Sequence, residues 1–136
     1  LPQAELIVVT TPQLMAQKVA TRVADMAKRS FIPLLGVIEN MSYFESDTGE
    51  KYNIFGEGGG EALSDKFGIP LLGKVPISEN TNNVADSGTP LIDQNDSNTK
   101  VELEKLINNI AIQLPPIIDE TCTGRLAKVF EELSNQ

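Results

Sequence analysis

Three short apolar runs restrict the fold of this sequence more than any other feature. They are residues 6–9 (LIVV), 33–38 (PLLGVI) and 71–75 (LLGKV). Short runs rich in leucine and β-branched residues are typical of strands that are buried on both faces of a sheet. Because helical patterns separate the runs, we predict an α/β fold, a parallel sheet with flanking helices and right-handed crossovers.

The first two intervals between the runs carry helix signals. Thr11 as N-cap and Pro12 at the first helical position predict where a first helix begins. Helical spacing predicts a core face for it made of Met15, Val19, Val23 and Met26. A second helix over 61–67 should end at Gly68, because a residue without Cβ suits the left-handed C-cap. Functional side chains are then expected just beyond the carboxyl ends of the strands.

Two further helices are predicted toward the end of the chain. Residues 99–102 (TKVE) have capping-box spacing. Apolar residues then follow at helical spacing until Pro115: Leu103, Leu106, Ile107, Ile110 and Leu114. A last amphipathic segment covers 125–133. We therefore divide the chain into a domain portion, 1–114, and a connector with a terminal helix, 115–136.

Charge and composition exclude several functions. The formal net charge is −8, with most acidic residues after position 44, which disfavours nucleic-acid binding through phosphate neutralisation. No stretch approaches the roughly 18 consecutive apolar residues of a membrane span, so we expect no membrane insertion and a cytoplasmic protein. Cys122 is the only cysteine and histidine is absent, so a metal site of His and Cys ligands within one chain is excluded. The first residue, Leu1, fits an excised fragment or a processed product.

The glycine cluster 56–60 and Asn40 each allow two interpretations. Glycine-rich backbone can cradle a phosphate, but no Gly-Lys-Ser or Gly-Lys-Thr occurs, so we favour a structural or interface loop. Asn40 follows the second apolar run, where its amide could bind a purine edge or cap the following turn. Pro76 follows the third run and by itself indicates only a loop. Residues 45–50 form an acidic stretch that we interpret as a solvated hairpin or excursion.

Five motifs together resemble a known family. They are VVTTPQ at 8–13, LGVIENMSYF at 35–44, FGEGGGEAL at 55–63, GIPLLGKVP at 68–76 and DSGTP at 86–90. In this order they are similar to the Mrp (ApbC-type) branch of the MinD-like P-loop ATPases, over about residues 5–95. The resemblance implies the C-terminal part of a P-loop NTPase fold and an ATP-dependent homodimer that carries iron–sulfur clusters to client proteins. It also implies that Asn40 reads adenine and that Pro76 lines the adenine pocket.

Two departures from the family pattern limit what the resemblance implies. The Walker A loop and switch segments are missing, so ATP and Mg²⁺ belong to the intact parent, no catalytic residue is assigned, and the chain alone should be inactive. Many relatives carry a C-x-x-C pair where this chain reads 45–48 (ESDT), which places an iron–sulfur cluster in doubt. Two alternative functions stay open: a MinD-like positioning ATPase, and a non-catalytic interaction domain.

Overall fold

A parallel three-stranded sheet forms the centre of the computed structural model. The structure describes residues 4–46, 48–78, 88, 92 and 97–114. The strands are β1 (Leu6–Thr10), β2 (Leu34–Glu39) and β5 (Leu71–Lys74), in the order β1-β2-β5. Strand β2 pairs in parallel with both neighbours, so the predicted α/β fold with a parallel sheet is confirmed.

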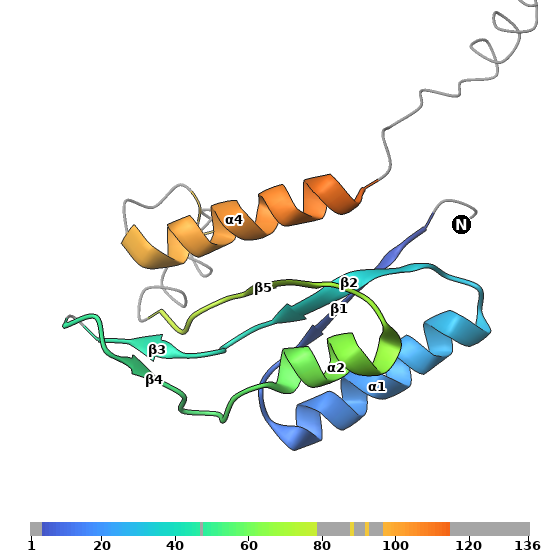
Figure 1. Cartoon of the computed structure of the whole chain (residues 1–136), viewed down its shortest axis with the longest axis horizontal. Coiled ribbons are helices and arrows are strands. Elements are labelled where there is room, and N and C mark those ends of the chain that lie inside the picture. The colour runs from blue at the N-terminus through green and yellow to red at the C-terminus, as the bar shows by residue number, and fades with distance from the viewer. Residues whose placement is uncertain (1–3, 47, 79–87, 89–91, 93–96, 115–136) are drawn as a thin grey trace, which may run out of the picture.

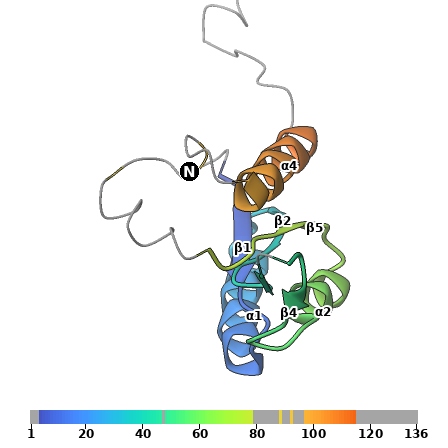
Figure 2. The same ribbon diagram turned by 90° about the vertical axis from the view of Figure 1, so that its left-hand side faces the viewer.

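Helices cover both faces of this sheet (Figures 1 and 2). Helix α1 (Leu14–Arg29) follows β1, and α2 (Gly59–Phe67) precedes β5 on the same face. Helix α4 (Ser97–Gln113) lies on the opposite face and packs against β5. Gly73 permits this contact, because a Cβ there would lie 3.0 Å from the Leu106 side chain. No helix in the described residues is long and apolar enough to cross a membrane.

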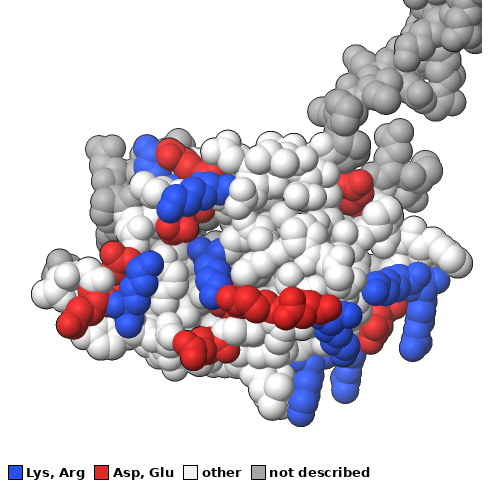
Figure 3. Space-filling model, viewed as in Figure 1, with Lys and Arg blue, Asp and Glu red and all other residues white. Residues whose placement is uncertain are grey.

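A short hairpin interrupts the alternation of strands and helices. It consists of β3 (Phe44–Glu45) and β4 (Lys51–Tyr52), paired antiparallel. Lys51 lies 3.9 Å from the Glu45 carboxylate, so the acidic stretch is a hairpin with its own ion pair, as interpreted from the sequence. Figure 3 shows acidic and basic side chains next to one another on this face of the molecule.

The predicted core face of α1 is wrong. Its members are largely exposed, at 71% for Met15, 60% for Val19, 39% for Val23 and 54% for Met26. The buried face is instead made of Ala20, Ala24 and Ala27. Alanine lets the helix axis approach the sheet closely, and Ala24 packs in the core with Val8 and Val37.

The predicted first residues of three helices also need correction. Helix α1 begins at Leu14 with Gln13 as N-cap, so Thr11 and Pro12 lie in the preceding turn. Helix α2 begins at Gly59, before the predicted residue 61, and it ends as predicted at Gly68, whose φ of 65° is left-handed. Helix α4 already begins at Ser97, which places Thr99 inside its first turn. The segments 115–136 and 125–133 lie outside the described residues.

An ion pair joins α2 to β5. The Lys74 ammonium lies 2.5 Å from the Glu61 carboxylate. Burial alone would raise the pKa of Glu61, but hydrogen bonding and the positive charge of Lys74, with a backbone hydrogen bond, lower it. The pair therefore favours the folded state only while Glu61 is ionised.

The assignment of the α1 faces predicts that two substitutions lower the free energy of unfolding by different amounts. Ala24→Leu should lower the free energy of unfolding by about 1–3 kcal/mol, because the core has no room for a larger side chain. Val19→Ser should change it by no more than about 0.5 kcal/mol, because the residue is exposed. Urea unfolding of the chain measures both values. A larger loss in Val19→Ser than in Ala24→Leu would contradict the assignment.

The Glu61–Lys74 pair predicts a pH dependence of stability. The pKa of Glu61 is lower in the folded state than its unfolded value of 4.5. The stabilisation that the ion pair gives to the folded state is therefore present above pH 4.5, and it is lost as the pH falls through the folded-state pKa. Glu61→Gln should therefore destabilise the chain more at about pH 7 than at about pH 3. Urea midpoints of both proteins at both pH values test this, and an equal difference at both would contradict it.

Candidate functional site

The carboxyl ends of the three sheet strands meet at one edge of the molecule. Asn40, directly after β2, donates its backbone N–H to the carbonyl of Thr10 at 2.7 Å. On the other side, Val75 N–H donates to the Glu39 carbonyl at 2.8 Å. These bonds place Asn40 and the buried Pro76 at the ends of neighbouring strands, as the sequence predicted. Polar side chains beyond strand ends are the usual place for a ligand in such sheets.

The side chain of Asn40 uses only part of its hydrogen-bonding capacity. Its Oδ1 accepts a hydrogen bond from Met41 N–H at 2.9 Å, which is the turn-capping contact considered from the sequence. The carbonyl oxygen retains a second lone pair, and in the described part of the chain Nδ2 donates to no protein acceptor. Asn40 is half-buried, so capping the turn leaves a donor and an acceptor for a ligand.

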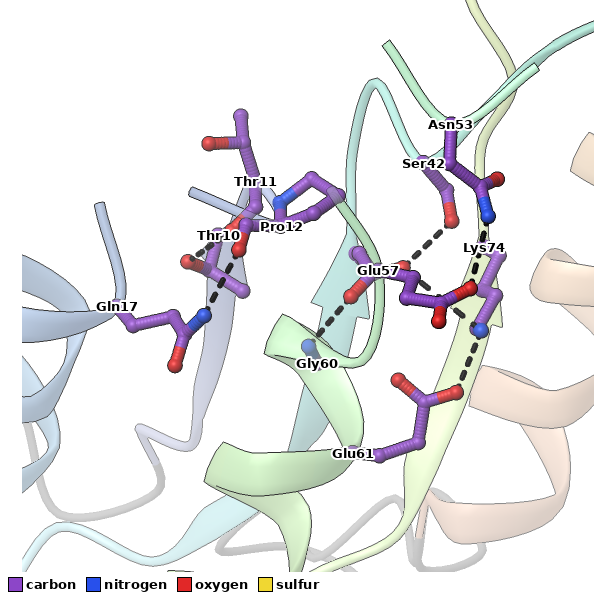
Figure 4. Close-up of polar contacts among 11 residues, drawn as sticks. Thr10, Thr11, Pro12, Gln17, Ser42, Asn53, Glu57, Gly60, Glu61 and Lys74 are labelled. Carbon is purple, nitrogen blue, oxygen red and sulfur yellow. Dashed lines mark hydrogen bonds and ion pairs between the residues drawn. The ribbon is translucent and has the colours of Figure 1, made fainter. Parts of the chain in front are cut away.

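A buried carboxylate supports this edge. Glu39, the last residue of β2, has no exposed surface. Its Oε1 accepts from Ser42 Oγ at 2.5 Å, and its Oε2 accepts from Gly60 N–H at 2.5 Å (Figure 4). The Lys74 ammonium lies 3.8 Å from Oε1. The pKa of Lys74 is raised by the hydrogen bond to Glu61, against burial, and further by the charges of Glu61 and Glu39.

The glycine cluster is structural, in agreement with the interpretation favoured from the sequence. A Cβ on Gly59 would lie 2.8 Å from the Cα of Pro12, and one on Gly60 would lie 2.8 Å from the Cβ of Glu39. Both glycines are needed because α2 begins in contact with the ends of β1 and β2. The Gly60 amide is bound to Glu39, and Glu61 lies in the next position, so this helix start does not fit a phosphate.

An open groove of about 400 Å³ runs between β1 and α1. It is lined by Ile7, Val8, Val9, Thr10, Thr11, Ala16, Val19, Ala20, Val23 and Asn40. The buried Thr11 Oγ1 in this groove has no hydrogen-bond partner in the described residues. Pro76 is not among the lining residues. The lining is apolar with a few polar groups at the strand ends, which fits an aromatic base and provides no cationic group for phosphates.

No group of three or more candidate metal ligands occurs in the described residues. Cys122 lies outside them, as does Asp47.

Glu45 in the hairpin accepts a hydrogen bond from Asn98, which ties β3 to the start of α4.

The Glu39, Ser42, Gly60 and Lys74 network was missed from the sequence because its members come from separate elements. One signal was available. Glu39 ends an otherwise apolar central strand, and a carboxylate is almost never fully buried unless it is paired.

Comparisons with known proteins agree with this architecture. A 46% identical relative is an iron–sulfur cluster carrier protein of Deinococcus radiodurans, matched over 63% of this chain and 24% of its own length. The carrier protein of Pyrococcus furiosus is 42% identical over 76% of this chain and 37% of its own length. The chain thus spans about a quarter to a third of these relatives.

Solved structures show the same fold. The cell division ATPase MinD of Pyrococcus furiosus superposes with a TM-score of 0.61 at 22% identity, over 81% of this chain and 43% of that one. A nucleotide-binding protein of Archaeoglobus fulgidus, solved in complex with ADP, gives 0.52 at 34% identity, over 60% of this chain and 34% of that one.

The family model that matches describes a NUBPL iron-transfer P-loop NTPase and covers residues 1–111. This match and the carrier relatives confirm the Mrp-type resemblance seen in the motifs. The chain therefore belongs to the family of NUBPL iron-transfer P-loop NTPases.

Proposed function

We propose that this chain forms the adenine side of the nucleotide site in an ATP-hydrolysing iron–sulfur cluster carrier. The observation that carries the proposal is Asn40, a half-buried amide at the carboxyl end of the central strand with donor and acceptor capacity left over. An amide with both groups can pair with the edge of adenine, which offers a donor and an acceptor side by side. Pro76 is buried after the neighbouring strand β5 and outside the open groove, and its backbone would contribute to the base site as the family resemblance implies.

The phosphate side of the site belongs to a part of the domain that is not in this sequence. No Walker A loop occurs in it, and the Gly60 amide is already bound to Glu39. The surface of α1 supports this division, because Met15, Val19 and Met26 are exposed and Val19 also lines the open groove along β1. Such an apolar face fits the rest of a P-loop domain packing against it.

ATP and Mg²⁺ would bind in the complete protein, where they supply the phosphoryl-transfer chemistry. This chain would hold the base through Asn40 and Pro76 and has no residue that we assign to the phosphates. The iron–sulfur cluster is cargo, and its ligands are not among the described residues. Following the family, we take the complete protein to act as a cytoplasmic homodimer that delivers clusters to client proteins.

The assignment of Asn40 predicts a loss of base selectivity. In the complete protein, Asn40→Ala should weaken ATP binding by about 1–3 kcal/mol, because a buried polar partner is left unpaired. The preference for ATP over GTP should fall with it, because the amide contacts the base and not the phosphates. Dissociation constants for ATP, GTP and ITP measure both effects.

Ala24→Leu is the control for lowered fold stability, because Ala24 packs in the core and is not among the residues that line the groove. If Asn40→Ala leaves the ATP-to-GTP ratio at the wild-type value, Asn40 only caps its turn and the adenine assignment is wrong.

The division of the site predicts that the 136-residue chain alone hydrolyses no ATP above background in the presence of Mg²⁺. Positioning and charge stabilisation of the phosphates supply most of phosphoryl-transfer catalysis, and those groups are missing. Phosphate release by the homogeneous chain measures this. Turnover that persists through purification would show that the phosphates are handled by residues of this chain.

A further inference from the structure

Glu39 makes more contacts than its position in the central strand requires. The strand ladder uses only its backbone, through the carbonyl that accepts from Val75 N–H. Its side chain is fully buried and holds two partners from different parts of the chain, Ser42 and Gly60, with Lys74 beside them. A buried carboxylate is costly to desolvate and persists only when its oxygens are well paired.

The Ser42 contact closes a short turn around Asn40. Glu39 and Ser42 flank Asn40 and Met41, and the hydroxyl of Ser42 donates to Glu39 across them at 2.5 Å. The Ser42 backbone N–H is also fixed, because it donates to the Val75 carbonyl at 3.0 Å. Asn40 therefore sits in a loop whose two flanking residues are bonded to each other.

Met41 shows that this turn is held in a costly conformation. Its φ is 54°, in the left-handed region, which costs an ordinary side chain about 1–2 kcal/mol. Its N–H donates to Asn40 Oδ1, so the left-handed turn also sets the direction of the Asn40 side chain. Surrounding bonds must offset the cost of this conformation, and the Ser42–Glu39 bond lies directly across the turn.

The Gly60 contact anchors the same carboxylate to α2. The N-cap residue Gly58 has no side chain to cap this helix, and Glu39 Oε2 accepts the free Gly60 N–H in its place. Because Gly60 has no Cβ, Glu39 approaches the helix directly. Figure 4 labels the two donors, Ser42 and Gly60, and Gly60 lies in the first turn of α2.

From these contacts we infer that Glu39 is a positioning residue for base recognition. Its carboxylate binds both Ser42 and Gly60, and so holds the Asn40–Met41 turn at a fixed position relative to α2. The inference rests on the proposed role of Asn40. Glu39 itself does not touch the nucleotide. Its effect is on the fraction of molecules in which the Asn40 amide faces the base, and hence on apparent affinity and selectivity.

A purely structural Glu39 would give a different pattern. Loss of a helix cap lowers stability and leaves the choice between bases unchanged, because both nucleotides use the same fold. Loss of the contacts that hold the turn lowers the ATP-to-GTP preference even where the protein stays folded. The ratio of the two dissociation constants therefore separates the two roles.

The test uses Ser42→Ala and Glu39→Gln in the complete P-loop protein, with ATP and GTP as probes. Ser42→Ala removes one bond across the turn and keeps the α2 cap. Each variant should lower the ATP-to-GTP preference, by about tenfold or more, the factor for one hydrogen bond to a charged group. Ser42→Ala alone decides the test if Glu39→Gln does not fold.

A rescue variant tests the strained turn itself. Met41→Gly removes the steric cost of the left-handed conformation, because glycine adopts positive φ readily. Added to Ser42→Ala, it should restore most of the lost preference. Because relief of this strain also stabilises the fold, the urea midpoint is measured beside the ratio, and recovery of the midpoint without recovery of the ATP-to-GTP ratio would contradict the positioning role.

Ala24→Leu is the matched control, because it destabilises the core without contact to the turn. It should keep the wild-type ratio. If Ser42→Ala and Glu39→Gln also keep it while Asn40→Ala loses it, the positioning role of Glu39 is overturned and the adenine assignment stands. If Asn40→Ala keeps the ratio as well, both are overturned.

Discussion

The paired carboxylate of Glu39 is the interaction on which the functional edge of this structure depends. Glu39 is the last residue of the central strand β2, and the ends of β1 and β5 lie on either side of it. Through Gly60 it fixes where α2 begins, and through Ser42 it closes the turn that carries Asn40. Because a buried carboxylate tolerates no unpaired oxygen, the positions of the helix and the turn are coupled and neither is free to shift alone.

The sequence predicted the layers of the fold better than their contacts. The apolar runs identified the three strands of the parallel sheet and predicted that they run in the same direction, because strands buried on both faces are typical of parallel sheets. The face of α1 was predicted wrongly because small residues, and not the larger apolar ones, let the helix approach the sheet closely. In this chain the alanines face the sheet, and Met15 and Val19 face outward beside the groove.

The candidate site was predictable only where one residue carries the signal. Asn40 and Pro76 follow apolar runs, so their place at the strand ends follows from the topology alone. The supporting network was not predictable, because Gly60 lies 21 residues from Glu39 and the contact requires the packing of α2 to be known. The glycine cluster was interpreted correctly as structural, but its reason, close approach to Pro12 and Glu39, needed the structure.

The small-residue face of α1 also explains how this chain holds the edge of its sheet in place. Its small residues Ala20 and Ala24 pack with Val8 and Val37 into a core that is closed within this chain. The turn of Asn40 is fixed by bonds to Thr10, Ser42 and Gly60, all of them in the same chain. The turn that carries Asn40 is therefore fixed by contacts within this chain. A turn that is fixed in advance loses little conformational entropy when a ligand binds, which favours the base recognition that we propose for Asn40.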